Sequence, residues 1–161
     1  MTTPDPLSPE PFSEPELAAW RGMLETHARI TRALDAQMQA EHGLSVPAYE
    51  VLMFLADAPG HRLRMAEIAE RVLLSRSGCT RLVDRLVQSG HVTRSTADTD
   101  GRGLFAQLTD LGAEKVAAAR RTHRAGVRSA FLEHLSEEDQ AALGDIWARL
   151  RATAPRSRTR P

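Results

Sequence analysis

The stretch LLSRSGCTRLVDRLVQSG, residues 73–90, decides the fold. Ser75 is of a type that caps the start of helices, and Gly90 readily takes the left-handed conformation that ends them. Apolar positions between these two residues recur at helical spacing. They predict a short helix whose buried side consists of Cys79, Leu82, Val83, Leu86 and Val87.

A second short helix is predicted immediately before this one, over residues 65–72. Its apolar positions, Ile68, Ala69 and Val72, fall on one side. Residues 73–74 leave room only for a brief turn between the two helices. Two short helices joined in this way form a helix-turn-helix.

The pattern changes after Gly90. Residues 91–95 and 104–108 predict two strands, and the segment between them is polar and rich in turn formers. A further short strand is expected at 61–64. A β-hairpin that follows a helix-turn-helix predicts the winged helix-turn-helix architecture.

Long helices are predicted on both sides of this unit. An apolar stripe predicts a helix over 15–41, ended by Gly43, and a helix capped by Ser45 follows it. After the hairpin, Thr109 caps a second long helix that extends to about residue 134. The sequence Ser136-Glu137-Glu138-Asp139 resembles a capping box before a last helix. The fold class is therefore mainly α with a small β-hairpin.

Five regions follow from this reading. The winged unit covers 44–109, and the helical flanks cover 14–43 and 110–152. Residues 1–13 are Pro-rich and acidic, so we expect a disordered N-terminal arm, and 153–161 form a basic flexible tail.

Composition narrows the class of protein. The chain has 161 residues and no net charge, but nine acidic residues against three arginines leave −6 over 1–60. Eight arginines against five acidic residues leave +3 over 61–109. No segment has the ~20 apolar residues of a membrane span, and none resembles a secretion signal. The single cysteine precludes an internal disulfide and fits a reducing cytoplasm.

The N-terminal end of the 75–89 helix carries the strongest functional signal. Arginine donates two hydrogen bonds to a guanine edge, serine and threonine reach bases or phosphates, and a helix N-terminus favours phosphate. The predicted DNA-binding residues here are Ser75, Arg76, Ser77, Thr80 and Arg81. The alternative is the polar face of an ordinary surface helix.

The hairpin tip offers a second contact. Arg102 lies between two glycines and is placed to enter a narrow minor groove. The acidic residues Asp98 and Asp100 are compatible with DNA binding if one of them pairs with an arginine, such as Arg102 or Arg85, and orients it. The alternative is a solvated loop, because Asp-Gly is a common turn dipeptide.

These motifs together resemble the MarR family of bacterial regulators. The similarity lies in residues 80–86 (TRLVDRL), Gly90, Arg94, residues 98–103 (DTDGRG) and residues 108–112 (LTDLG), and it covers about 44–112 closely. Two departures are Arg64-Met65, where many members have a serine or threonine cap, and His91, where an apolar residue is common.

The resemblance implies a homodimer whose interface is formed by the first helix and the last two helices. The protein would bind double-stranded DNA at a roughly palindromic operator and regulate transcription, with repression as the expected action. Position by position, Ser77, Thr80 and Arg81 become recognition-helix contacts, Arg102 the wing-tip arginine and Asp100 its orienting acid. Arg94 is also predicted to belong to the DNA-binding set.

The family often binds small anionic aromatic compounds between the dimer helices and the DNA-binding lobe, which usually weakens DNA binding. Trp20, His27, Tyr49 and Met53 lie on the first two helices and are candidates for such a cleft. For each of them, packing in the protein interior is the alternative.

Redox and metal sensing are disfavoured. Some relatives sense peroxide through a cysteine in the first helix, where this chain has none; Cys79 lies on the inner side of its helix, which favours a structural role. The six histidines include no pair at the spacing of a helical zinc site, so we expect neither metal nor cofactor.

Other classes of protein fit the sequence less well. We find no phosphate-binding loop or nucleophile elbow, so we expect no enzyme. A winged protein-interaction module that has lost DNA binding stays open. A nonspecific architectural DNA-binding protein also stays open, although the neutral net charge argues against it.

Overall fold

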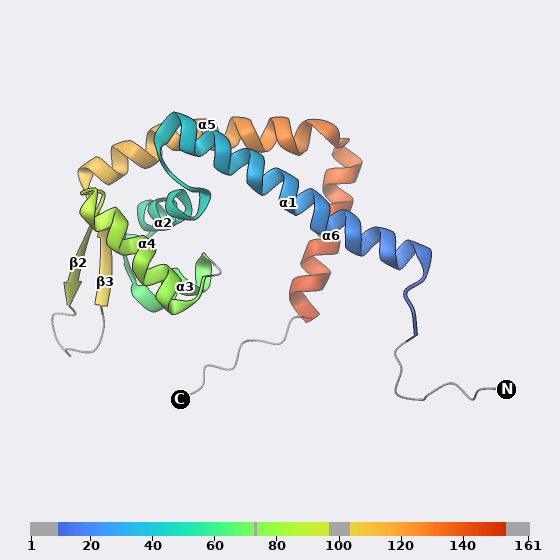
Figure 1. Ribbon diagram of the computed structural model, residues 1–161, viewed down its shortest axis with the longest axis horizontal. Helices are drawn as coiled ribbons and strands as arrows, with labels where there is room; N and C mark the ends of the chain where they lie inside the picture. Colours follow the sequence, from blue (N-terminus) through green and yellow to red (C-terminus); the bar gives the residue numbers. More distant parts are fainter. Residues whose placement is uncertain (1–9, 73, 97–103, 154–161) are drawn as a thin grey trace.

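The computed structural model describes residues 10–72, 74–96 and 104–153, and it is mainly helical with a small sheet (Figure 1). This confirms the predicted fold class. The elements in chain order are α1 (Glu14–His42), α2 (Val46–Asp57), the 3-10 turn η1 (Pro59–His61), β1 (Arg62–Arg64), α3 (Met65–Arg71), α4 (Arg76–Gln88), β2 (Val92–Thr96), β3 (Leu104–Leu108), α5 (Asp110–Ala130), η2 (Leu132–His134) and α6 (Glu137–Thr153).

The short helices and the strands form one lobe. The sheet has the order β1-β3-β2 with antiparallel pairing, and its register sets Leu63 and Arg94 on either side of Ala106. The expected strand at 61–64 is thus confirmed as an edge of this sheet. The core of the lobe contains the fully buried side chains of Tyr49, Leu52, Leu55, Ile68, Val83 and Val92.

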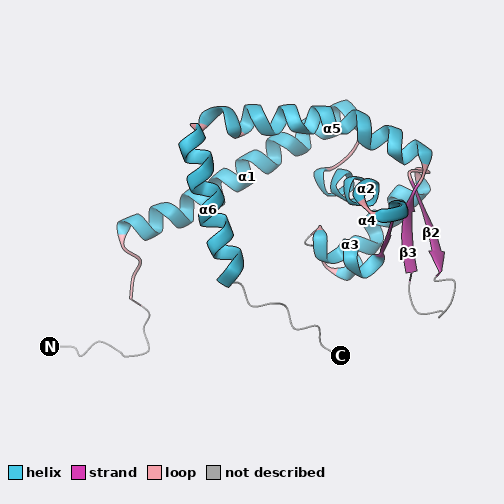
Figure 2. Ribbon diagram, turned by 180° about the vertical axis from the view of Figure 1, so that it is seen from behind, coloured by secondary structure: helices cyan, strands magenta, loops and turns pink. Residues whose placement is uncertain are grey.

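The long helices extend away from the lobe. Helices α1 and α5 run side by side above it, and α6 turns away at the end of α5 that is distant from the strands (Figures 1 and 2). No residue of α6 is buried. Among the described residues, no helix combines the length and the apolar character that a membrane crossing requires.

Most helix ends form where local sequence predicts them. The hydroxyl oxygens of Ser45, Ser75 and Thr109 each accept a hydrogen bond from the backbone N–H three residues later, at 3.3, 3.1 and 3.0 Å. Gly43 and Gly90 take φ values of 63° and 76°, as their positions at helix ends require. The predicted capping box at Ser136 and Asp139 is also present.

One junction joins α4, the base of the wing and α5. Thr109 donates its hydroxyl proton to the carbonyl oxygen of Gly90 (2.7 Å) and its backbone N–H to that of His91 (3.1 Å). Gly112, in the first turn of α5, lies so near that an added Cβ would be 2.2 Å from the His91 carbonyl oxygen. We refer to these four residues as the 90–112 junction.

Three details differ from the sequence predictions or extend them. Val87 is 36% exposed, because it lies at the edge of the apolar stripe of α4. The second long helix ends at Ala130 rather than near 134, because Phe131 leaves the helical region at φ −139° and ψ −64°. The start of α3 has an arginine, Arg64, where a side-chain acceptor is usual; the Glu67 carboxylate instead accepts the Arg64 N–H at 2.8 Å.

Candidate nucleic-acid interface

The polar side chains at the N-terminal end of α4 are exposed, as its amphipathic pattern requires. Ser75, Arg76, Ser77, Thr80 and Arg81 face solvent, while Cys79, Leu82, Val83 and Leu86 anchor the opposite side in the core. The structure therefore brings together the five residues that the sequence singled out on this helix. They form an exposed surface at the N-terminal end of α4, which we call the α4 face.

Hydrogen bonds within the α4 face define what it offers to a ligand. Thr80 donates its hydroxyl proton to the Arg76 carbonyl oxygen (2.9 Å), so the hydroxyl presents lone pairs outward. Arg76 and Arg81 make no side-chain hydrogen bond or ion pair with any described residue. The α4 face thus combines two guanidinium donors with a hydroxyl acceptor, which suits the mixed donors and acceptors of base edges.

An ion pair fixes the wing against α4. Arg94 of β2 contacts the Asp84 carboxylate of α4 through one guanidinium nitrogen, and its other terminal nitrogen donates to the Thr80 carbonyl oxygen at 3.2 Å. The two side chains are 24% and 43% exposed, respectively. Arg94 is predicted to contact DNA; in this structure its guanidinium has two partners inside the protein, and these contacts join β2 to α4.

Sequence reasoning did not assign a role to Asp84. Arg94 lies ten positions further along the chain, and the available signal was an acidic residue in an otherwise basic helix. The predicted wing-tip residues Arg102, Asp100 and Asp98 lie outside the described residues.

Two arginines also stack on the base of the wing. The Arg62 guanidinium lies 4.0 Å from the centre of the Phe105 ring, and that of Arg64 lies 5.2 Å from it. Cations above an aromatic face are attracted by its quadrupole. This cluster joins β1 to β3 and adds positive charge to the lobe.

The four residues suggested for a ligand cleft occupy two different surroundings. Tyr49 and Met53 are both on α2. Tyr49 is buried and its ring lies 4.6 Å from that of His123 on α5, whereas Met53 is half-buried. Trp20 is 51% exposed, and His27 is also exposed, on the part of α1 that extends away from the lobe (Figure 1). The four therefore do not surround one common cavity.

Burial shifts the titration of several groups. It raises the pKa of Tyr49, which Arg120 partly opposes, and it lowers the pKa of His123. Cys79 is 1% exposed, and burial raises the pKa of its thiol. Because the thiolate is the reactive form, this position suits packing more than redox chemistry.

Within residues 10–72, 74–96 and 104–153, no His, Cys, Asp and Glu side chains are grouped to hold a metal ion.

The fold is that of a winged helix-turn-helix protein of the DNA-binding class. It consists of a short helix, a turn, a basic helix with an exposed face, and a three-stranded wing.

Comparison with known proteins gives the family. A family model described as "MarR family" matches residues 42–103. The transcriptional repressor YetL of Bacillus subtilis is 33% identical over 115 residues, which cover 69% of this chain and 68% of YetL.

Solved structures agree over nearly the whole chain. Sco3205, a MarR family transcriptional regulator of Streptomyces coelicolor solved in complex with DNA, is 33% identical. The match covers 95% of this chain and 96% of Sco3205, with a TM-score of 0.88. AbsC of the same organism is 32% identical, with 90% and 100% coverage and a TM-score of 0.80. The chain therefore belongs to the MarR family of transcriptional regulators.

Proposed function

We propose that the protein represses transcription by binding double-stranded operator DNA as a homodimer in the cytoplasm, without a catalytic role. The observation that carries this proposal is the α4 face, in which Arg76 and Arg81 are exposed at the start of a helix and without partners among the described residues. The name of YetL as a repressor and the DNA complex of Sco3205 support the same activity.

On DNA, the N-terminal end of α4 enters the major groove. Arg76 and Arg81 donate hydrogen bonds to base edges or phosphates, and Thr80 accepts them. The Arg94–Asp84 ion pair holds the wing at a fixed angle to α4, so that both elements meet the duplex together. Base contacts by α4 give sequence preference, and contacts to phosphate set the register.

Exposed apolar side chains support the homodimer. Trp20 and Leu24 on α1, and Ile146, Trp147 and Leu150 on α6, are each between 36% and 55% exposed. A groove of about 760 Å³ between α1 and α6 is lined almost entirely by apolar side chains. Large exposed apolar surfaces of this kind are typical of protein interfaces. A two-fold dimer would present its two α4 helices to major grooves about 34 Å apart, which favours a pseudo-palindromic operator.

The repressor is also proposed to respond to a small anionic aromatic ligand, as the resemblance implies. The Tyr49 ring lies 4.6 Å from that of His123 on α5, and Met53 packs against the core of the lobe, whereas Trp20 and His27 are exposed on α1. Tyr49 is therefore placed to sense a change between the lobe and α5.

Fluorescence anisotropy with the DNA upstream of the protein's own gene tests the main proposal. We expect tight, salt-dependent binding that exceeds binding to a scrambled duplex. Arg81→Ala should weaken it by about 1–3 kcal/mol if Arg81 contacts a base. Arg128→Ala, an exposed arginine on α5, is the control and should change little.

Two results would contradict the proposal. Equal affinity for scrambled DNA would indicate an architectural protein instead of a specific regulator. Absence of binding at low salt would indicate an interaction module.

A further inference from the structure

The outer face of the wing sheet is polar and cationic. Residues directly opposite one another in the strand register share a face, and Leu63 and Ala106 are buried on the inner face. The outer face therefore has two rows, each with one residue from every strand: Ser95, Phe105 and Arg64, then Thr93, Gln107 and Arg62. None of the described strand residues is acidic, so this face favours an anionic partner.

Arg64 lies at the end of the outer face that is nearest to the wing tip. It pairs with Phe105, the second residue of β3, whereas Arg62 pairs with Gln107, nearer to the base of the wing. In Figure 1, the tip-side end of β2 and β3 lies on the side of the lobe that is distant from α5, as α3 does. Because α3 begins directly after Arg64, this arginine lies where the wing meets the helix-turn-helix.

A contact with α4 fixes the place of Arg64 beside the recognition helix. The Cys79 thiol of α4 donates to the carbonyl oxygen of Met65, the residue after Arg64, at 3.9 Å. Cys79 directly precedes Thr80, which belongs to the α4 face. Arg64 therefore lies close to both elements that are proposed to meet DNA.

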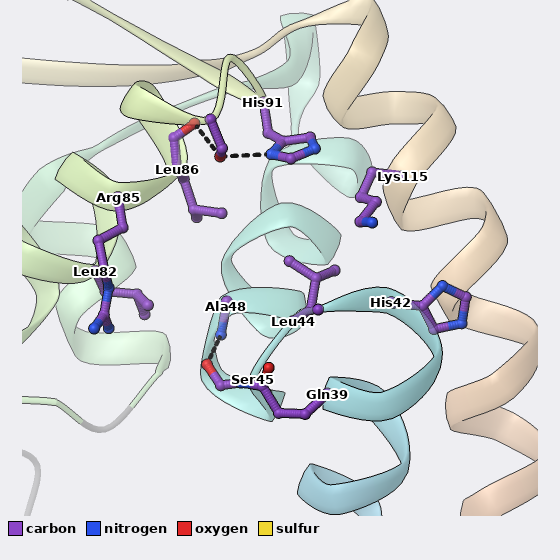
Figure 3. Close-up of a pocket in the computed structure, with 12 residues that line it drawn as sticks. Gln39, His42, Leu44, Ser45, Ala48, Leu82, Arg85, Leu86, His91 and Lys115 are labelled. Atoms are coloured by element: carbon purple, nitrogen blue, oxygen red, sulfur yellow. Dashed lines mark hydrogen bonds between the residues drawn. The ribbon is translucent and has the colours of Figure 1, made fainter.

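Helix α4 is itself firmly seated in the lobe. Figure 3 shows its inner side turned toward the segment that leads into α2, with buried core side chains on both: Leu82 and Leu86 of α4, and Leu44 and Ala48 opposite them. The separation between α4 and the start of α3 is therefore set by packing, and Arg64 keeps its place relative to the α4 face.

The Arg64 guanidinium is stacked, but its N–H donors are available. It lies 5.2 Å from the centre of the Phe105 ring, and it makes no side-chain hydrogen bond or ion pair with a described residue. The Glu67 carboxylate accepts from the Arg64 backbone N–H instead. Stacking orients the plane of a guanidinium while leaving its edge able to bind an anion.

We propose that Arg64 binds a phosphate of the DNA strand that passes between α4 and the wing. With α4 in the major groove and the wing at the neighbouring minor groove, the sugar–phosphate strand between these grooves crosses the boundary of the two elements. Arg64 is at this boundary, and Phe105 is its positioning residue. The inference rests on the proposed function, to which it adds a contact that is independent of base sequence.

The salt dependence of binding tests this contact. Each phosphate contact contributes about 0.9 to the slope of log affinity against log salt concentration, so losing one in each subunit of a dimer should reduce the slope by about 1.8. Arg64→Ala should weaken binding about tenfold at low salt, by the same factor on operator and scrambled DNA. Arg64→Lys should restore most of the slope, whereas Arg128→Ala, which removes an exposed charge from α5, should leave it unchanged. A loss confined to the operator would overturn the phosphate contact.

Operator duplexes that each carry one neutral methylphosphonate locate the contact. The wild type should bind less tightly when the phosphate held by Arg64 is neutral. Arg64→Ala should be indifferent at that phosphate and keep its sensitivity at the others. An identical pattern for the two proteins would contradict the proposal.

A double substitution tests the role of Phe105. Phe105→Leu keeps an apolar side chain but removes the ring, and it should weaken DNA binding about threefold. In the Arg64→Ala background it should cause no further loss, because the two residues act together. Equal losses in both backgrounds would overturn the positioning role of Phe105.

The wild type in the same titrations separates this inference from the proposed function. If it binds no duplex at low salt, both are overturned. Tight operator binding, with affinity, slope and phosphate pattern unchanged in Arg64→Ala, supports the proposed function and overturns the role of Arg64.

Discussion

Removing the charge of Asp84 should damage DNA binding more than it damages the fold. Asp84→Asn keeps the shape of the side chain and an acceptor oxygen, but it replaces the ion pair with Arg94 by a weaker hydrogen bond between a charged and a neutral group. Because the two side chains are 24% and 43% exposed, solvent screens the pair, and we expect a loss of about 1 kcal/mol in unfolding free energy. For a chain of this length, that lowers the melting temperature by about 2–4 °C.

The expected effect on DNA is larger because a dimer uses the ion pair twice. If each wing needs about 1 kcal/mol to regain its angle to α4, operator affinity falls by about 2 kcal/mol, or about 30-fold. Anisotropy titrations measure this loss, and calorimetric unfolding measures the stability of the same sample.

A matched control is the other ion pair of the described chain. Asp57 accepts from Arg120 at 2.8 Å, and this pair joins α2 to α5, with side chains 60% and 30% exposed. Asp57→Asn should leave operator affinity unchanged. An Asp84→Asn protein that binds DNA as well as this control would refute the idea that the pair positions the wing. Arg94→Gln adds a further check: a loss much greater than that of Asp84→Asn would mean that Arg94 contacts DNA directly.

Three further predictions concern stability and assembly. Gly112→Ala should destabilise the fold by about 1–3 kcal/mol in chemical denaturation, because its Cβ would meet the His91 carbonyl oxygen. Gly144→Ala, whose Cβ meets nothing within 4 Å, should instead be neutral or stabilise by about 0.5–1 kcal/mol, and equal effects would contradict the argument. Burial lowers the pKa values of His91 and His123 below the ordinary 6.5, so the unfolded chain binds more protons as pH falls through 6.5. The melting temperature should therefore be highest above pH 6.5 and decline below it, and asparagine at either position should flatten that decline. Trp147→Glu should place a charge in the exposed apolar surface of α6 and weaken a dimer by about 2 kcal/mol or more, whereas an unchanged sedimentation coefficient would remove this surface from the interface.

Local chemistry explains why most element boundaries were predictable. Ser45, Ser75 and Thr109 cap helices through their own hydroxyl groups, and Gly90 takes a conformation that other residues avoid. Such signals depend on a few neighbouring residues, so the sequence carries them in full. The end of α5 was misplaced because Phe131 has no comparable signal, although its backbone leaves the helix.

Contacts between distant segments were not predictable in the same way. The stacking of Arg62 on Phe105 depends on β1 joining the sheet beside β3, which no local pattern encodes. The pairing of Asp84 with Arg94 depends on the angle between wing and helix.

Helix length explains why the suggested ligand residues are dispersed. Trp20 and His27 were grouped with Tyr49 and Met53 because neighbouring helices carry them. However, α1 has 29 residues and is about 43 Å long at 1.5 Å per residue, so its two halves have different surroundings. Whether any of the four binds a ligand stays a prediction.

The 90–112 junction makes α5 a lever for the DNA-binding lobe. Two hydrogen bonds and the close approach of Gly112 hold the first turn of α5 to the end of α4 and the base of the wing, so we expect these parts to turn together as one body. The 21 residues of α5 give a lever arm of about 31 Å, on which a tilt of about 5° at the far end moves the lobe by about 3 Å. In a dimer, a tilt at the far ends of the two α5 helices would thus change the distance between the two recognition helices.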